Sequence, residues 1–221
     1  MLILPVIFMF KCVRKVTVHP LFFFCLAWIV FTQSSLVLLC VMTAVALHEC
    51  GHIFAYSCAH VIIDEIHLQP FGVRITIRNE LLIRPRTQLL CALAGPMANW
   101  LCVFLFWLVS TMLTIPEWCW LFFISSLFLG LFNLLPIMPL DGSRILGVIL
   151  SAIFQEYVAQ VIGAWISLIF GMGVFAFGIF VLIDSGLNVS LCILAGYILI
   201  CLAIKIYNSL KKRIFNVKPK T

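Results

Sequence analysis

Long apolar runs separated by short polar segments dominate this chain. Six of these runs can cross roughly 30 Å of hydrocarbon as helices, some only with flanking residues included. The pattern therefore predicts an all-α polytopic membrane protein with about six transmembrane helices. The expected spans are residues 20–33, 36–59, 87–112, 118–137, 158–183 and 187–207.

The fourth expected span is interrupted near its end by Asn133, Pro136 and Pro139. Proline lacks a backbone donor and breaks a helix interior, so the chain is expected to be unwound before Asp141. Residues 142–155 are then expected to form a short helix that continues the span.

Residues 61–79, between the second and third spans, have a different pattern. From Val73 to Arg78 apolar and polar residues alternate with period two, which is typical of a strand. Ile62–Leu68 is a weaker partner strand, so we predict a small β-hairpin at the cytosolic face. The hairpin either covers the helix ends as a connector or pairs with an extended substrate by strand addition, and the sequence favours neither role.

Composition supports the membrane class, because 64% of the residues are hydrophobic against about 45–50% in soluble proteins. The 221 residues are expected to form one membrane-embedded domain, residues 1–221, with no soluble C-terminal domain. The apolar run at residues 1–10 precedes its basic residues, which is the reverse of a cleavable signal. The ten cysteines form no C-x-x-C pair and are expected to be buried singly.

Basic residues are distributed asymmetrically around the expected spans. With six spans and both termini in the cytosol, all 14 Lys and Arg lie on the cytosolic side or at its boundary. The opposite loops, near residues 33–35, 117 and 184–188, contain none. Because cytosolic loops are enriched in Lys and Arg, both termini are expected in the cytosol. This bias and attraction to anionic lipid explain the net charge of +6, and no nucleic-acid partner is expected.

His48–His52 places ionisable side chains inside the second expected span. The sequence is His-Glu-Cys-Gly-His, so the two histidines share one face of a helix. In the H-E-x-x-H motif the histidines bind zinc and the glutamate acts as general base. The alternative is a coincidental polar patch, but charged side chains in hydrocarbon cost roughly 2.5–3.5 kcal/mol each. We therefore predict that His48 and His52 bind zinc and that Glu49 is the catalytic base.

Asp141 is the candidate for a third ligand. Catalytic zinc takes three protein ligands and leaves one position for water. Asp141 follows the unwound end of the fourth span, and irregular backbone at membrane depth is tolerated where it is buried or lines a watery cavity. The favoured role is therefore zinc ligand. The alternative is an N-cap for the helix that starts near Gly142.

Three ordered motifs together resemble the site-2 protease family of intramembrane zinc peptidases. They are His48–His52, Ala94–Pro96 with Asn99, and Asn133–Gly142. The resemblance extends over about residues 15–210 and is stronger to the sporulation members of that family. It implies that His48, His52 and Asp141 bind Zn²⁺ and that Glu49 is the base. It also implies that the substrate is held by Asn133, Pro136 and Pro139.

The resemblance further implies a membrane-associated protein substrate, a pro-sigma factor during sporulation, and an inhibitory membrane partner. The location would be the bacterial cell membrane or the membrane around the forespore. Val73 and Ser143 depart from the family, whose members usually carry a glycine at each position. The chain also ends at Thr221, where the sporulation members continue into a soluble regulatory domain.

The main alternative is a site-2-type protease that acts on another membrane-tethered regulator. A transporter would also keep ionisable groups in the membrane, but inverted repeats are expected there and none is visible in the sequence. A metalloenzyme acting on lipid would require a headgroup pocket. A catalytically dead scaffold is disfavoured by the presence of Glu49.

Overall fold

The computed structural model describes residues 13–20, 22–23, 27, 30–31, 33–69, 72–77, 83–185, 192–193 and 195–204. The chain divides into two compact units, Met1–Asn133 and Leu134–Thr221.

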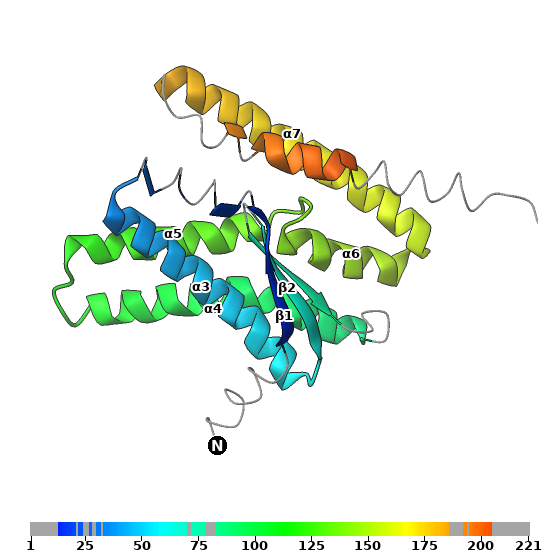
Figure 1. Cartoon of the computed structure of the whole chain (residues 1–221), viewed down its shortest axis with the longest axis horizontal. Helices are drawn as coiled ribbons and strands as arrows, with labels where there is room; N and C mark the ends of the chain where they lie inside the picture. Colours follow the sequence, from blue (N-terminus) through cyan, green and yellow to red (C-terminus); the bar gives the residue numbers. More distant parts are fainter. Residues whose placement is uncertain are drawn as a thin grey trace, which may run out of the picture. The chain divides into compact units, whose positions relative to one another are not determined.

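Three helices form the larger part of the first unit. They are α3 (Ser35–Cys58), α4 (Pro85–Ser110) and α5 (Glu117–Asn133), and they lie side by side in contact with one another (Figure 1). Ser34 starts α3 as its N-cap, because its hydroxyl accepts a hydrogen bond from the Val37 N–H at 3.4 Å. Pro85 starts α4 at a position where a missing N–H costs nothing.

The buried face of α3 repeats every fourth residue. Cys40, Ala44, His48, His52 and Tyr56 are each at most 5% exposed. Residues four apart occupy the same face of a helix, so this stripe is the face that α4 and α5 cover. The two motif histidines are therefore part of the packed interior and not of the outer surface.

A three-stranded sheet completes the described part of the first unit. Its strands are β1 (Val13–Val18), β2 (Ile63–Gln69) and β3 (Gly72–Ile77), in the spatial order β1-β2-β3. β2 and β3 are antiparallel, whereas β1 runs parallel to β2. A parallel pair requires a crossover connection, and α3 lies within that connection.

The sheet is attached to the helices by an apolar cluster. Ile63, Ile75 and Ile77 from the sheet pack with Tyr56 of α3 and Cys91 of α4. Lys15 on β1 contacts Glu65 on β2, with 3.2 Å between Nζ and Oε1. The hydrogen bond from Lys15 holds the pKa of Glu65 below its usual value.

The predicted hairpin at 61–79 is confirmed as β2 and β3, although Pro70, Phe71 and residues 78–79 lie outside the described residues. The expectation of an otherwise all-α chain is corrected by β1. Its apolar residues Val13, Val16 and Val18 do not alternate strictly, and its partner lies far along the chain, so no local pattern indicated it.

The second unit contains α6 (Asp141–Ile153), α7 (Glu156–Ser185) and a described helical stretch at Ala195–Ile204. Residues 134–140, which precede α6, form turns and bends. This segment is anchored to α7, because the buried Ser167 hydroxyl donates to the Pro136 carbonyl at 3.0 Å. The predicted unwinding before Asp141 and the short helix after it are both confirmed.

Three described helices are long and apolar enough to cross a membrane: Ser35–Cys58, Pro85–Ser110 and Glu156–Asp184. They match the expected spans 36–59, 87–112 and 158–183. The expected span 118–137 is the shorter helix α5, which ends at Asn133 before the proline segment. The spans 20–33 and 187–207 lie partly outside the described residues, so the number of six spans stays a prediction.

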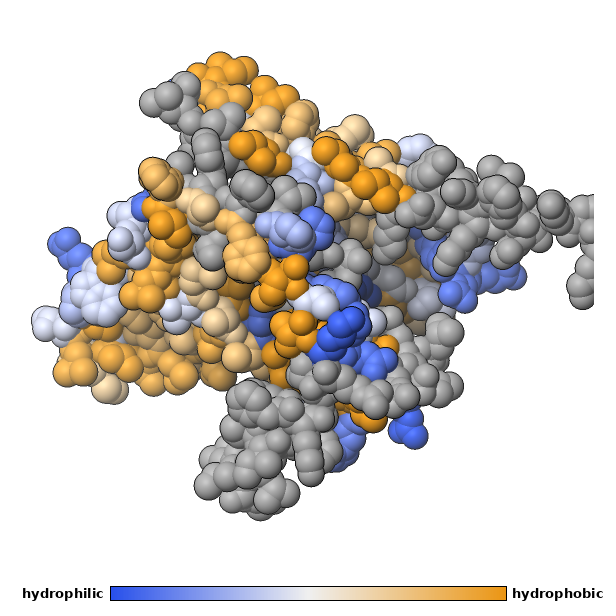
Figure 2. All heavy atoms as spheres, viewed as in Figure 1, coloured by the Kyte–Doolittle hydropathy of each residue, from blue (hydrophilic) through white to orange (hydrophobic). Residues whose placement is uncertain are grey.

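The helical surface is apolar, as expected for contact with lipid. Figure 2 shows hydrophobic residues over much of the described surface on this side. On α4, Leu101, Phe104 and Trp107 are each more than half exposed. Large exposed apolar surfaces are unusual on soluble monomers.

Gly142 allows the proline segment to fold against the start of α6. A Cβ at Gly142 would lie 2.1 Å from the Leu134 carbonyl oxygen, which is backbone and cannot move aside easily. We expect Gly142→Ala to destabilise the protein by about 1–3 kcal/mol, the usual range for overpacking. That is several degrees in Tm for a chain of this size, measured by thermal unfolding in detergent.

Gly147→Ala, also on α6, is the matched control, because no atom lies within 4 Å of a Cβ at that position. Its Tm should be unchanged or slightly higher, since alanine favours the helix. Equal Tm values for the two variants would contradict the close approach at Gly142.

Candidate metal centre

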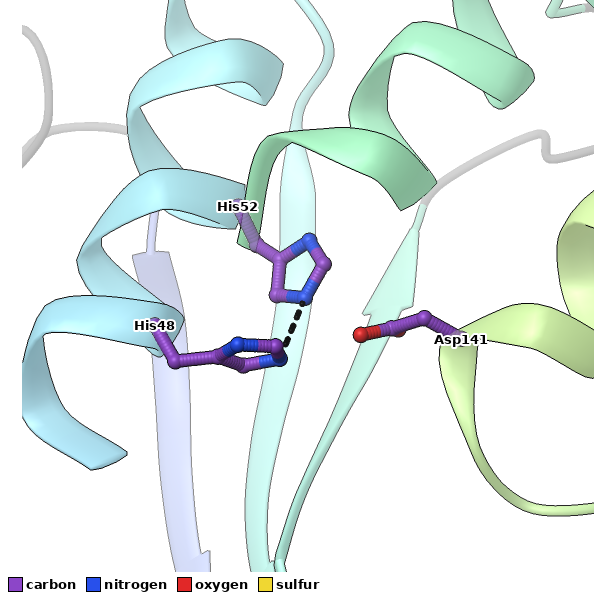
Figure 3. Close-up of side chains that lie close together, drawn as sticks. All are labelled: His48, His52 and Asp141. Carbon is purple, nitrogen blue, oxygen red and sulfur yellow. Dashed lines mark hydrogen bonds between the residues drawn. The ribbon is translucent and has the colours of Figure 1, made fainter. Parts of the chain in front are cut away.

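His48 and His52 lie on consecutive turns of α3, and each side chain is 4% exposed. Their rings are nearly perpendicular, with an interplanar angle of 82° and 4.8 Å between centroids. The two Nε2 atoms approach each other to 3.2 Å, as the dashed line in Figure 3 shows. The i, i+4 spacing thus brings one nitrogen of each ring to the same point.

The other ring nitrogens face α4. Nδ1 of His52 lies 2.7 Å from the Cys91 carbonyl oxygen, which can only accept a hydrogen bond. Nδ1 of His52 therefore carries hydrogen, and in the neutral ring Nε2 is an acceptor. Nδ1 of His48 lies 3.4 Å from the side-chain amide of Asn99.

Gly95 on α4 leaves open the space where the two Nε2 atoms meet. A Cβ on Gly95 would lie 2.3 Å from Nε2 of His52 and 2.8 Å from Nε2 of His48. Gly51 on α3 has a different neighbour, since its Cβ would meet the Ala94 carbonyl oxygen at 2.6 Å. Both glycines bring α3 and α4 close together, and Gly95 borders both imidazoles.

Asp141 is the third member of the group. One ligand atom from each of His48, His52 and Asp141 lies within 4.8 Å of the others, and all three residues are buried. Figure 3 shows both imidazoles and the carboxylate directed toward a common point. The N-cap of α6 is Leu140, and Asp141 is the first residue of the helix.

The donor set fits zinc. Two imidazole nitrogens and one carboxylate oxygen are ligands of catalytic zinc sites, which keep a fourth position open. Tetrahedral zinc with Zn–N bonds of about 2.0–2.1 Å separates two nitrogens by about 3.3 Å, close to the observed 3.2 Å. The hydrogen bond from Nδ1 of His52 to a carbonyl is also the usual support for a zinc-binding histidine.

The other predicted site residues occupy different surroundings. Glu49 is partly buried on α3 and lies within one turn of both histidines. Asn133 is the last residue of α5, and its side-chain N–H donates to the Leu129 carbonyl at 3.0 Å. Pro136 and Pro139 lie in the irregular segment, where Pro139 is exposed and follows a cis peptide bond.

Sequence reasoning missed the contribution of α4. It used Ala94–Pro96 and Asn99 only as a motif of the family resemblance and gave Cys91 no role beside the histidines. The available signal was spacing, because residues 91, 95 and 99 repeat every fourth position, as residues 48 and 52 do on the facing helix.

Helices of membrane-spanning length and a buried His, His, Asp group define a membrane-embedded protein with a metal centre. The sequence profile of peptidase family M50 matches residues 112–177, a range that contains Asn133 and Asp141. The chain is therefore similar to peptidase family M50 over this range.

Two curated relatives and one solved structure are similar to this chain. Stage IV sporulation protein FB of Bacillus subtilis (strain 168) is 28% identical over 140 residues, 63% of this chain and 49% of that protein. A zinc metalloprotease of Methanocaldococcus jannaschii is 34% identical over 112 residues, 49% of this chain and 32% of that protein. The chain thus spans half or less of the length of these relatives.

The site-2 protease from Methanocaldococcus jannaschii has a similar fold. Its structure matches with a TM-score of 0.63 over 83% of this chain and 87% of that chain, at 24% sequence identity. The likeness shows that the fold is shared.

The open space beside Gly95 generates a prediction about the metal. In Gly95→Ala the new methyl group would occupy the point where the Nε2 atoms meet, so the purified protein should lose most of its zinc. The wild type should hold about one zinc per chain, measured by elemental analysis.

Gly130→Ala is the control for crowding of α4. Its Cβ would lie 2.7 Å from the Trp100 side chain on α4, and its three nearest atoms include none of either imidazole. It should therefore keep zinc even where Tm falls. Full zinc content in Gly95→Ala, or equal loss in both variants, would contradict a specific role for Gly95.

Proposed function

We propose that this chain is an intramembrane zinc metalloprotease that cleaves a membrane-associated protein within or near the bilayer. The proposal rests on one observation above all. His48, His52 and Asp141 form a buried group suited to zinc. Glu49 lies on the same apolar helix as the two histidines. The match of residues 112–177 to peptidase family M50 and the similarity to a zinc metalloprotease support this reading.

The two histidines and Asp141 would hold the metal. Zinc in such a site supplies a Lewis acid and makes water nucleophilic at neutral pH. The imidazoles contribute neutral nitrogen donors, and the buried carboxylate supplies the negative charge that offsets the cation. α4 supports the donors, because the Cys91 carbonyl fixes the orientation of the His52 ring.

Glu49 is proposed as the general base. Its carboxylate would accept a proton from the attacking water and then donate it to the leaving amine. Glu49 adjoins His48 and is three residues from His52, so its side chain starts within one turn of both rings. It is only partly buried, which leaves room for water beside it.

The substrate backbone must be extended to be cut, because a helix shields its own carbonyls. β3 is the last strand in the order β1-β2-β3, so within the described sheet one of its edges has no neighbouring strand. Strand addition at that edge is compatible with this arrangement, as is the role of a connector.

Asn133, Pro136 and Pro139 are proposed to help hold the substrate. Asn133 uses one side-chain N–H for the Leu129 carbonyl, and its amide has a second N–H that can donate to a peptide or to a developing oxyanion. The two prolines keep residues 134–140 out of a helix.

The proposed substrate class is a pro-sigma factor made during sporulation. It rests on the similarity to stage IV sporulation protein FB at 28% identity. Another membrane-tethered regulator is the alternative substrate. The protein is proposed to lie in a bacterial cell membrane or the membrane around the forespore, with both termini in the cytosol. A membrane inhibitory partner is also proposed.

Replacement of Glu49 by glutamine tests the chemistry. Glu49→Gln keeps the side-chain shape but cannot accept a proton, so cleavage should fall by about 10²–10⁴-fold while zinc is retained. The measurement is gel analysis of the wild type and the variant, each co-expressed with a membrane-associated pro-sigma factor, together with zinc content.

Cys50→Ser is the matched control, because Cys50 is an exposed neighbour of Glu49 on the same helix. It should cleave at the wild-type rate. Cleavage by Glu49→Gln at near the wild-type rate would refute the base assignment and with it the protease reading. If the wild type cuts other membrane-tethered regulators but never a pro-sigma factor, only the substrate class is refuted.

A further inference from the structure

The two imidazoles of the metal centre meet α4 in related ways. Cys91, Gly95 and Asn99 are spaced four residues apart and are all buried, so they lie on one face of α4. Gly95 borders both Nε2 atoms. Cys91 accepts from Nδ1 of His52 on one side of Gly95, and Asn99 meets Nδ1 of His48 on the other. Each imidazole therefore meets one residue of α4 through Nδ1, the nitrogen that does not face the other imidazole.

Asn99 is fully buried, at 0% exposure, and one end of its amide has no partner. Its Nδ2 lies 3.4 Å from Nδ1 of His48, while its Oδ1 forms no hydrogen bond. A buried carbonyl oxygen without a donor destabilises the folded protein. Such an atom inside a helix bundle calls for an explanation.

The orientation of this amide determines which nitrogen of His48 carries hydrogen. If Nδ2 donates to Nδ1, the hydrogen of the neutral ring must be on Nε2, which then has no free lone pair. If the amide turns by half a rotation about Cβ–Cγ, Oδ1 takes the place of Nδ2 and accepts from Nδ1–H. The buried oxygen then has a donor, and Nε2 of His48 carries no hydrogen, so its lone pair can bind a metal as that of His52 can.

We propose that Asn99 is a positioning residue that accepts a hydrogen bond from Nδ1 of His48 through Oδ1. It thereby fixes the ring tautomer that presents Nε2 to the metal. The inference rests on the metal centre of the proposed function. In this proposal the Asn99 side chain accepts from His48 as the Cys91 backbone carbonyl accepts from His52.

Substitution of Asn99 separates this role from packing. Asn99→Leu removes the acceptor while keeping a side chain of similar size, and Asn99→Asp retains an oxygen acceptor at the same place. Loss of such a supporting partner typically weakens metal binding by 10–100-fold. Zinc affinity of the purified full-length chain, measured by competition with a chelator, should fall by this factor in Asn99→Leu. In Asn99→Asp it should stay within about threefold of the wild type, since the acceptor remains.

The hydrogen on Nδ1 of His48 gives a second readout that a structural role alone would not change. In the zinc-bound wild type, long-range ¹⁵N–¹H spectra should show the His48 Nδ1–H protected from exchange with water by its bond to Asn99. In Asn99→Leu this hydrogen should exchange faster.

Ser126→Ala is the control for loss of a buried polar group in the same unit. The Ser126 hydroxyl is fully buried and has no hydrogen-bond partner among the described residues. This variant should keep the zinc affinity and the slow exchange of the His48 Nδ1–H of the wild type.

Wild-type zinc affinity in Asn99→Leu would overturn the inference, and so would equal loss in Asn99→Asp and Asn99→Leu. A wild type that binds no zinc would refute the metal centre itself. Failure of cleavage with these affinities as expected would refute the protease reading and leave Asn99 in its role.

Discussion

Two imidazoles buried in an apolar helix bundle impose the constraint on which the first unit depends. Each ring has two nitrogens, and a buried polar atom without a partner is costly. One nitrogen of each ring is directed to α4, at the Cys91 carbonyl and the Asn99 amide. The remaining two converge at 3.2 Å, where a metal ion would satisfy both nitrogens at once. A bound metal ion would thus make this polar interior compatible with a membrane.

The packing of α3 follows from the same requirement. For α4 to reach both Nδ1 atoms, the two helices must approach closely, and Gly51 and Gly95 remove the side chains that would prevent it. The far end of α3 is fixed by Tyr56, which packs with Cys91 and the isoleucines of the sheet. α3 therefore carries the motif between two packed regions, and the glycines set its distance from α4.

Features that depend on local pattern could be predicted from the sequence, and features that depend on distant partners could not. The unbroken apolar runs indicated α3, α4 and α7, and the prolines indicated the irregular segment before Asp141. β1 was missed because its partner Ile63 pairs with Val13 from across a helix. The spacing of His48 and His52 indicated a metal site. Only their distance to α4 reveals Gly95 as the residue that keeps it open and Asn99 as a partner of His48.

X-ray absorption at the zinc edge of the purified full-length protein is the most direct test of the central claim. The account predicts scattering from two imidazoles, with oxygen in the other positions and no sulfur. Asp141→Ala should lose an oxygen ligand or the zinc itself. The chain has ten cysteines, so a sulfur shell is a real alternative. Sulfur at about 2.3 Å, or no imidazole scattering, would contradict the claim that His48 and His52 hold the metal.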